Sequence, residues 1–377
     1  MRNDPVTGIR EVLGKFDLAG ECLEIQPFGT GHINTTYASR WGRGLESVRY
    51  IHQRINDAVF KRPDQVMENI YRVTSHLYSA WKTEGVPDPE RRTLTVIPAR
   101  DGKPWVNDEK TGWWRTYAFV EGSCSMENAE SSGQARLLGA AVGKFQKQLA
   151  SLPPPRLHVA IAHFHDMEWR YQRFHEALKA DPKDRVREVS VELGFMLENE
   201  ERGSMLSTSL RTGSLPERIC HNDTKMNNML FDLTKETVLC VADLDTVMPG
   251  TVLYDFGDLV RTVTTRARED ERDLSTVIFN LDYFEALLEG YLSEAGEFLD
   301  ERELDLLAEA GRSMTQIMAI RFLTDFIEGD HYYHVAYPSH NLDRVRNQIA
   351  LIGSMDRKWG DIQRSTDRLR QKYNAHE

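Results

Sequence analysis

Three oxygen-bearing side chains follow one another along a short stretch of the chain, with a spacing that suits phosphoryl transfer. Asp223 precedes Asn228 by five residues, and Asp243 ends the apolar run VLCVAD. Phosphoryl transfer needs a carboxylate that takes the proton of the attacking hydroxyl, and hard oxygen ligands for the Mg²⁺ that neutralises the phosphates. We therefore predict Asp223 as the catalytic base, with Asn228 and Asp243 as Mg²⁺ ligands.

The order of these residues is that of a kinase catalytic loop, in which His-x-Asp is followed by Asn and then by a metal-binding Asp. An isolated His-x-Asp carries little weight, because Asn and Asp side chains commonly cap turns. The complete run HxDxxxxN, followed by an apolar strand that ends in DxD, is far more specific. We interpret it as a kinase-like site in which His221 hydrogen-bonds the loop backbone.

Asp255-Phe256-Gly257 offers an alternative metal site, because it looks like the magnesium motif of protein kinases. It lies beyond a Pro249-Gly250 turn and opens a helical stretch, whereas Asp243 ends a strand. The strand end favours Asp243 as the metal ligand. We expect Asp255 and Asp258 to cap the helix or to brace the loop.

A Gly-Thr-Gly turn at 29–31 joins two predicted strands and suits phosphate binding, since glycine lets the backbone approach an anion closely. His32 follows at the tip and could reach a substrate. The strand RYIHQRIN carries Gln53 in the register where kinases of this kind hold a lysine, and Arg54 is the nearest cation. Arg is not a neutral replacement for Lys. Either other groups grip the phosphates, or ATP is held mainly through Mg²⁺ and the loop backbone.

The elements that must position these residues fall into two regions. The first region reads as a small β-rich lobe, because short stretches alternate apolar and polar residues between turn signals. It also contains one long helix, in which Val66, Ile70 and Val73 recur at helical spacing. The expected elements are a helix at 5–16, strands at 22–28, 33–39 and 47–55, the helix at 64–81, and strands at 93–99 and 112–120 with a hairpin turn at Asp101-Gly102.

After Glu121-Gly122 helical patterns dominate, interrupted by one strand-rich island at 227–242. The sequence therefore predicts an α+β fold with two lobes. Residues 1–121 form a small antiparallel-sheet lobe that binds the nucleotide, and residues 122–377 form a larger, mainly helical lobe with the catalytic loop and the acceptor site. Helices of this second lobe are expected at 128–149, 166–180, 279–295, and from 300 nearly to the end.

Composition limits the classes of partner and compartment. The 377 residues carry a formal net charge of −11, which argues against a nucleic-acid partner. No stretch approaches the roughly 20 apolar residues that span a bilayer, and the first residues lack the apolar run of a signal peptide. The four cysteines show no CxxC spacing, so we expect reduced thiols, a cytoplasmic protein and no zinc site. The sequence gives no basis for an oligomeric state.

At these residues the sequence resembles a known group of enzymes. It is similar to the aminoglycoside phosphotransferase and choline kinase superfamily, which shares the protein-kinase-like fold. Within that superfamily it resembles the N-acetylhexosamine 1-kinase group, which also has Gln-Arg where a lysine is usual. The resemblance covers roughly residues 25–265 and continues through RFLTDFIEGDHYYH, and the segments that carry it are FGTGHINTTY, YIHQRIN, VMENI, HNDTKMNN, DLDTVMPG and YDFGDLVR.

The resemblance implies a reaction and a set of contacts. It implies transfer of phosphate from ATP, with Mg²⁺, to the anomeric hydroxyl of N-acetylglucosamine or N-acetylgalactosamine. The hinge from Phe119 to Gly122 would present backbone groups to the adenine. The implied substrate-binding residues are His32, Asp223, Asp243, Arg321, Tyr332 and Trp359. The nucleotide-binding residues are Gly29, Thr30, Gly31, Arg54, Phe119 and Glu121.

Arg321 and Tyr332 can converge only if their helix ends at Gly329, because eleven residues do not return to the same helix face. Without the resemblance, a structural salt bridge for Arg321 and packing under a loop for Tyr332 are the simpler interpretation. The acidic run Asp325, Glu328 and Asp330 could bind a cationic acceptor, or it could be a solvated helix face.

Other functions therefore stay open. A kinase of the same superfamily could act on an amino alcohol, homoserine or an aminoglycoside. A nucleotide-binding pseudokinase is disfavoured, because all three catalytic positions are filled. A metal hydrolase is disfavoured too, since the only concentration of histidines, His331, His334 and His340, lacks a spaced set of carboxylates.

Overall fold

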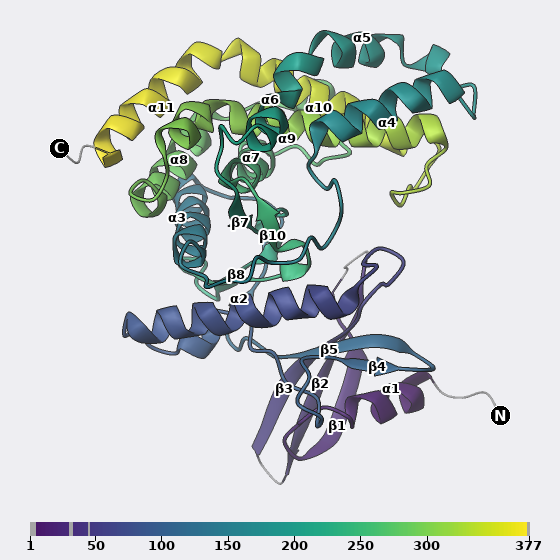
Figure 1. The fold of residues 1–377 in the computed structure, drawn as a ribbon, viewed down its shortest axis with the longest axis vertical. Coiled ribbons are helices and arrows are strands. Elements are labelled where there is room, and N and C mark those ends of the chain that lie inside the picture. The colour runs from purple at the N-terminus through teal and green to yellow at the C-terminus, as the bar shows by residue number, and fades with distance from the viewer. Residues whose placement is uncertain (1–4, 30–32, 44–45, 375–377) are drawn as a thin grey trace. The chain divides into compact units, whose positions relative to one another are not determined.

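The computed structural model describes residues 5–29, 33–43 and 46–374. The chain divides into two compact units, each described by itself (Figure 1). The first unit comprises Met1–Ser123, Leu152–Ile161 and Leu239–Met248, and the second comprises Cys124–Ser151, Ala162–Val238 and Pro249–Glu377. The N-terminal part of the first unit ends two residues beyond the predicted lobe boundary at 121. Two later segments of the chain also belong to it, which the sequence did not indicate.

The first unit is built on an antiparallel sheet of five strands in the order β1-β2-β3-β5-β4. Tyr50 and Trp114 lie on the buried side of this sheet, and α1 (Pro5–Leu13) packs there through Val12 and Leu13. Burial of these large apolar surfaces fixes the helix against the sheet. The strands are β1 (Glu21–Pro27), β2 (Thr35–Arg43), β3 (Glu46–Arg54), β4 (Val106–Asp108) and β5 (Gly112–Ala118).

The long helix α2 (Pro63–Thr83) matches the helix predicted at 64–81. Pro63 suits the first helical position, where a missing N–H costs nothing. The negative charge of Asp64 in the first turn interacts favourably with the positive end of the helix dipole. Val66, Ile70 and Val73 are buried, as their spacing predicts.

The predicted strand at 93–99 is wrong as a regular strand. The segment makes isolated bridges, Phe16 to Ala99 and Val96 to Tyr117, and the strand that pairs with the start of β5 is β4. Residues 95–97 follow the second half of β5, where the Ile97 N–H donates to the Thr116 carbonyl at 2.9 Å. Two short segments thus share one edge of β5. Pro98, which has no N–H, helps to end the first of them.

The second unit is mainly helical, as predicted. Its helices α3 and α8 approach so closely that a Cβ at Gly139 would lie 2.0 Å from the Leu287 carbonyl oxygen, and a Cβ at Gly290 2.0 Å from that of Arg136. Only glycine permits this contact. The helices are α3 (Ser132–Leu149), α4 (Met167–Ala180), α5 (Ser190–Glu198), α6 (Glu200–Arg211), α7 (Val252–Val263), α8 (Leu281–Ala295), α9 (Glu301–Glu328), α10 (His340–Arg357) and α11 (Trp359–Asn374).

Short strands frame the segment that carries the predicted catalytic residues. The predicted island at 227–242 appears as β8 and β9, which follow the catalytic loop. The strands are β6 (Ser123–Cys124), β7 (Arg218–Cys220), β8 (Met229–Asp232), β9 (Val238–Val241) and β10 (Met248–Gly250). Single 3₁₀ turns, η3 (Met226–Asn228) and η4 (Leu244–Thr246), complete the region.

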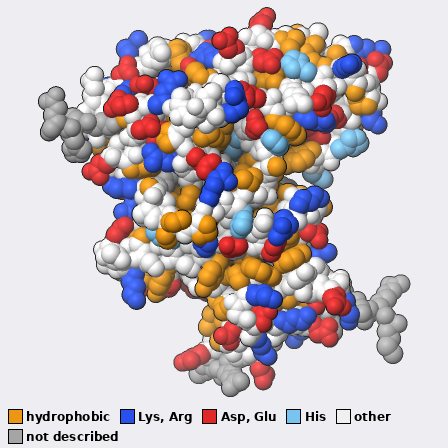
Figure 2. Space-filling view, viewed as in Figure 1, with side chains coloured by type: hydrophobic (Ala, Val, Ile, Leu, Met, Phe, Trp, Pro, Cys, Tyr) orange, Lys and Arg blue, Asp and Glu red, His pale blue; other side chains and the backbone are white. Residues whose placement is uncertain are grey.

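The predicted α+β class, with a small antiparallel-sheet lobe and a larger helical lobe, is confirmed. Among the described residues, no helix has both the length and the apolar character needed to cross a bilayer. On the face shown in Figure 2, acidic and basic side chains are interspersed.

Candidate active site

The loop that carries Asp223 is held by hydrogen bonds to the carboxylate of Asp255. This buried side chain accepts the backbone N–H groups of His221 at 3.0 Å and Asn222 at 2.7 Å, together with the Gln146 amide at 3.0 Å. Asn222, whose N–H is held by Asp255, has a left-handed backbone with φ 65°. Asp255 therefore braces the catalytic loop, as predicted. His221 also hydrogen-bonds the loop, accepting the Asp223 N–H at its Nδ1 (3.2 Å).

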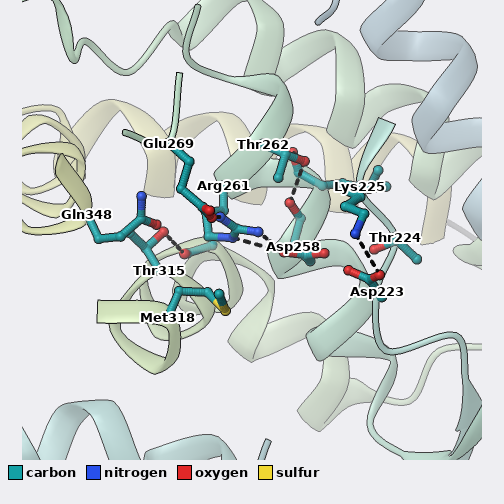
Figure 3. A network of polar contacts seen from close by, with 12 residues as sticks. Asp223, Thr224, Lys225, Asp258, Arg261, Thr262, Glu269, Thr315, Met318 and Gln348 are labelled. Atoms are coloured by element: carbon teal, nitrogen blue, oxygen red, sulfur yellow. Dashed lines mark hydrogen bonds and ion pairs between the residues drawn. The ribbon is translucent and has the colours of Figure 1, made fainter. Parts of the chain in front are cut away.

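Asn228 and Lys225 hold the Asp223 side chain. The Asn228 amide nitrogen donates to both the carbonyl (2.8 Å) and the carboxylate (3.1 Å) of Asp223. The Lys225 ammonium pairs with the same carboxylate at 3.0 Å (Figure 3). Because the Asn228 nitrogen is used as a donor, its Oδ1 is the atom with which this residue would ligate a cation.

These neighbours set the charge of Asp223. Burial by itself raises the pKa of the carboxyl group. The positive charge of Lys225, the His221 ring and the hydrogen bond from Asn228 outweigh burial, and the pKa of Asp223 lies below its ordinary value. Asp223 is therefore ionised at neutral pH and can accept a proton from a hydroxyl group.

A second carboxylate, Asp258, lies on α7 and is paired within that helix. Arg261 donates to Asp258 at 2.9 Å and to Glu269 at 2.8 Å (Figure 3). Burial raises the pKa of Asp258, and its partner Arg261 opposes that shift. Asp258 thus forms an ion pair with Arg261 within α7, and its predicted role as a helix cap or loop brace stays a prediction.

The structure brings Arg321 and Tyr332 together. Helix α9 ends at Gly329, which has φ 112°, and the chain turns back so that the Arg321 guanidinium lies 5.8 Å from the centre of the Tyr332 ring. The same guanidinium lies 4.9 Å from the Phe164 ring and 5.6 Å from the Tyr333 ring. Arg321 is only 8% exposed, whereas Tyr332 is 59% exposed.

The Asp223 carboxylate also influences the charge of Arg321. Burial lowers the pKa of Arg321, but Tyr333, Tyr332 and the Asp223 carboxylate act in the opposite direction, and the net shift is upward. Arg321 therefore carries its charge within electrostatic reach of the predicted base. The alternative reading of Arg321 as part of a structural salt bridge finds no support among the described contacts of that side chain, which are with aromatic rings and with the Met318 sulfur at 3.6 Å.

Asp325 organises the turn that carries Tyr332. Its buried carboxylate accepts the backbone N–H groups of residues 331, 332 and 333 at 2.9, 2.8 and 3.0 Å, and the Asn341 amide at 2.9 Å. The other two acidic residues of this run are also paired, Asp330 with Arg185 and Glu328 with Arg173, each at 2.5 Å. The run is therefore structural, not an open acidic cluster.

The sequence analysis missed two basic residues of this region. His165 is buried, and its Nε2 donates to the Asn222 carbonyl at 2.9 Å. Burial, followed by the charge of Arg321, lowers the pKa of His165 to about 3, so the ring is neutral. Arg170 donates to the Phe164 carbonyl at 3.0 Å, and burial together with Arg321 lowers its pKa to about 10.

Residues of the DxD loop lie in the first unit. Asp243 adopts φ 57°, a left-handed conformation that is unusual for a residue other than glycine. Asp245, two residues later, is buried and forms an ion pair with Arg115 of β5. Arg115 was not predicted as a site residue. The signal in the sequence was a lone cation inside the apolar strand GWWRTYAFV.

The remaining nucleotide-side residues are placed in part. Gly29 is exposed with φ 73°, and Arg54 is exposed at the end of β3. Thr30, Gly31 and His32 lie outside the described residues, so the predictions made for them have no structural counterpart.

The predicted hinge is held by arginines of the first unit. The Phe119 N–H donates to the Arg49 carbonyl at 3.0 Å, and the Arg49 guanidinium lies 3.8 Å from the centre of the Phe119 ring. Arg49 also pairs with the Glu121 carboxylate, with its Nε at 2.8 Å. Arg91 donates to the Glu121 carbonyl at 2.9 Å.

Trp359 lies in a different cluster from Arg321 and Tyr332. It begins α11, and the guanidinium of Arg202 lies 4.4 Å from the centre of its ring. Arg202 in turn pairs with Glu309 at 3.0 Å. Among the described residues, the contacts of Trp359 do not join it to the Arg321 group.

Comparison with known proteins gives a family and a fold. The family model described as "Phosphotransferase enzyme family" matches residues 24–304. An aminoglycoside phosphotransferase from Alicyclobacillus acidocaldarius is 13% identical with a TM-score of 0.57, over 95% of this chain and 96% of that chain. A microcompartment-associated aminopropanol kinase is 15% identical with a TM-score of 0.56, over 95% and 98%. An ethanolamine kinase from Plasmodium vivax is 12% identical with a TM-score of 0.53, over 86% and 82%. These likenesses confirm the predicted protein-kinase-like fold.

Proposed function

This chain belongs to the phosphotransferase enzyme family, and on that premise we propose that it transfers the γ-phosphoryl group of ATP, with Mg²⁺, to the anomeric hydroxyl of an N-acetylhexosamine. Family membership makes the chain a phosphotransferase with an alcohol-group acceptor. The nucleotide, the metal ion and the sugar are proposed. The observation that carries the choice of acceptor is the buried, positively charged Arg321 beside Tyr332 and within electrostatic reach of Asp223.

The charge around Asp223 supports a neutral acceptor. Arg321 and Arg170 both lie near enough to lower the pKa of His165, and Arg321 also lowers that of Arg170. A cationic amino alcohol or aminoglycoside would meet these positive charges at close range. The acidic run from 325 to 330, which could have bound such a cation, is occupied by backbone N–H groups and by arginines.

A sugar suits the polar and aromatic groups of this region. Hydroxyl and acetamide oxygens accept hydrogen bonds from guanidinium groups, and the exposed ring of Tyr332 offers a face for the apolar side of a pyranose. The Nε of Arg170, the Nδ1 of His165 and the hydroxyl of Tyr333 are buried without a hydrogen-bond partner among the described residues.

The proposed mechanism starts from the ionised Asp223. Its carboxylate accepts the hydrogen bond of the anomeric hydroxyl, orients it, and takes its proton as the oxygen–phosphorus bond forms and the bond from the γ-phosphorus to the bridging oxygen breaks, so that ADP leaves. The Asn228 Oδ1 and the Asp243 carboxylate are the proposed Mg²⁺ ligands, and both are hard oxygen donors. When bound, Mg²⁺ supplies positive charge that offsets the negative charge of the phosphates.

Magnesium often binds through one or two protein oxygens together with substrate phosphates. The described residues contain no cluster of three or more His, Cys, Asp or Glu side chains that would form a metal site by themselves. The two proposed oxygen ligands, from Asn228 and Asp243, fit a cation that arrives bound to a nucleotide.

The adenine is proposed to bind the hinge. The Phe119 N–H and the Glu121 carbonyl are already used by Arg49 and Arg91. We therefore assign the adenine contacts to the Phe119 carbonyl and the Glu121 N–H. The glycine turn at 29–31 and Arg54 stay predicted phosphate contacts, and His32 stays a predicted sugar contact, whereas the contact of Trp359 with Arg202 gives no support to its predicted role.

Product analysis with a panel of acceptors tests the proposal. We expect ADP release with N-acetylglucosamine and N-acetylgalactosamine, little with glucosamine, and none with choline, ethanolamine or kanamycin. Phosphorus and proton NMR of the product should place the phosphate on the anomeric carbon. Phosphorylation of a cationic acceptor in preference to the sugars would overturn the choice of acceptor. Phosphate on another sugar hydroxyl would overturn the choice of position.

A further inference from the structure

Arg115 is a buried cation in the middle of the first unit. It lies on β5, is 1% exposed, and ranks among the largest fully buried side chains. Its Nε donates to the Gln53 Oε1 at 2.9 Å, and its Nη1 forms an ion pair with Asp245 and lies 3.9 Å from the Met67 sulfur. A guanidinium is retained in such surroundings only when a carboxylate and further hydrogen bonds compensate for the lost water.

The partner carboxylate belongs to the loop of the proposed metal ligand. Asp245 follows Asp243 by two residues, within the 3₁₀ turn η4. Its second oxygen accepts the Asn34 Nδ2–H at 2.5 Å, and the side-chain Oδ1 of Asn34 accepts the Asn56 N–H at 3.0 Å. The Asp245 side chain is therefore held by Arg115 of β5 and by Asn34, which directly precedes β2.

The network also accounts for the glutamine at the position where a lysine is usual. Gln53 on β3 and Arg115 on β5 are direct cross-strand partners. The Gln53 amide donates to the Thr36 hydroxyl at 3.1 Å and accepts from Arg115. A lysine at this position would place an ammonium group beside the buried guanidinium. The buried cation of this sheet is therefore Arg115 on β5, and its cross-strand partner on β3 is the neutral Gln53.

Helix α2 holds the same loop through a neutral side chain. The Asn69 amide donates to the Val247 carbonyl at 3.0 Å and to the His158 carbonyl at 2.8 Å, and its oxygen accepts the His158 N–H at 2.9 Å. Asn69 is buried. The helix thus anchors the end of the DxD loop without contributing a carboxylate.

We propose that Arg115 is a positioning residue that sets the Asp243 loop through its ion pair with Asp245. Asp243 needs such support, because its left-handed backbone is disfavoured for a residue with a Cβ and persists only where the surroundings fix it. Burial lowers the pKa of Arg115, but the Asp245 carboxylate raises it, and the net shift is upward. The Asp243 carboxylate is also close enough to contribute to that upward shift. This inference rests on the proposed function only for the role of Asp243 as a metal ligand.

The test removes the pair without leaving a buried charge. Arg115→Met alone would strand Asp245, and Asp245→Asn alone would strand Arg115, so either variant could fail to fold. The double variant Arg115→Met/Asp245→Asn replaces both charges by neutral groups of similar size. Lys15→Met/Asp108→Asn is the matched control, because it removes an ion pair of the same unit that lies at β4.

Calorimetric binding of Mg²⁺–ADP, with no acceptor present, is the main measurement. We expect the double variant to fold, with Mg²⁺–ADP binding weakened about 10- to 100-fold, as for other residues that orient a metal ligand. The control should bind as the unchanged protein does. In turnover assays the Mg²⁺ concentration for half-maximal rate should rise, while the KM of the acceptor stays the same.

The outcomes separate this inference from the proposed function. A folded double variant that binds Mg²⁺–ADP as the unchanged protein does would overturn the positioning role of Arg115. If the double variant does not fold, Arg115→Lys decides: it keeps the charge but has a single nitrogen for two partners, and unchanged Mg²⁺–ADP binding by that variant would also overturn the inference. A wrong choice of sugar would leave all these binding results unchanged. Failure of the unchanged protein to bind Mg²⁺–ADP would contradict the proposed function and this inference together.

Discussion

Asp223 owes its charge state to side chains within a few residues of it in the sequence. Lys225 and Asn228 both contact its carboxylate, and His221 receives its backbone N–H. The contacts of the Asp223 carboxylate thus come from its own loop, whereas the backbone of that loop is held by the distant Asp255. The spacing of Asp223 and Asn228 predicted that the two side chains lie together, and their roles as base and metal ligand stay predictions.

Asp223→Asn should abolish most of the turnover and leave nucleotide binding intact. An asparagine keeps the shape of the side chain but cannot accept the hydroxyl proton, so kcat should fall about 10²- to 10⁴-fold. Steady-state kinetics and Mg²⁺–ADP calorimetry measure the two effects. Asp184→Asn, at an exposed ion pair with Arg187, is the control and should change neither. Activity retained by Asp223→Asn would show that another group is the base.

Lys225→Met should shift the pH dependence of activity. Lys225 stabilises the carboxylate form of Asp223 and so keeps its pKa low. Without that charge the pKa rises, and Asp223 becomes protonated at a higher pH. The acid limb of the kcat/KM profile should therefore move to higher pH, even if the maximum rate also changes. An acid limb that stays in place would mean that Asp223 is not the group whose ionisation limits activity.

Arg115 shows where prediction from residues fails. Its partner Asp245 lies 130 residues further along the chain, and no spacing rule joins a strand cation to a loop carboxylate at that separation. Arg54 was proposed because it stands next to Gln53 in sequence. In a strand, however, neighbouring residues point to opposite faces, and the cross-strand partner of Gln53 is Arg115.

At the scale of elements, the turn after α9 uses one buried carboxylate, that of Asp325, to fix the position of the exposed Tyr332 ring. Gly329 ends the helix, and Asp325 collects the N–H groups of the next residues, including that of Tyr332. The glycine could be identified as a stop signal from the sequence. The role of Asp325 could not, because an Asp one turn before a helix end also suits a solvated face.

Asp325→Ala should therefore affect both stability and acceptor binding. It would leave the N–H groups of residues 331–333 without their acceptor, which we expect to lower the free energy of unfolding by about 2–4 kcal/mol. The turn would no longer fix Tyr332, so the KM for the sugar should rise while the KM for ATP stays the same. Thermal unfolding and steady-state kinetics measure these effects.

Glu328→Gln is the matched control for that prediction, since it changes a neighbouring acidic residue whose pair with Arg173 is partly exposed. It should alter stability by less than about 1 kcal/mol, as for most surface ion pairs. Equal increases in KM for sugar and ATP in Asp325→Ala would point to general loosening of the protein, not to a role of the turn in acceptor binding.

At the scale of the whole molecule, the change from strand-rich to helical composition after residue 122 predicted two lobes, and this was sufficient to identify the fold class. The assignment of residues 152–161 and 239–248 to the first unit could not be predicted. Their attachment depends on specific contacts such as Asn69 with His158 and Arg115 with Asp245. Composition carries no information on contacts of that kind.

A fragment of residues 1–123 should consequently fold poorly. It retains Arg115 and Asn69 but lacks Asp245, His158 and Val247, so a buried charge and a buried amide lose their partners. We expect weak dispersion of its amide NMR signals. Arg115→Met in the same fragment should improve that dispersion, because it removes the uncompensated charge. A well-dispersed spectrum from the unchanged fragment would contradict this expectation.

The dependence of Arg115 on the distant Asp245 has a consequence for the synthesis of the protein. Ribosomes deliver a chain from its N-terminus, and domains commonly fold as soon as they emerge. Here the sheet emerges early, but the carboxylate that neutralises its central guanidinium is at position 245. We therefore expect the first unit to complete its folding only after residue 245 has been translated.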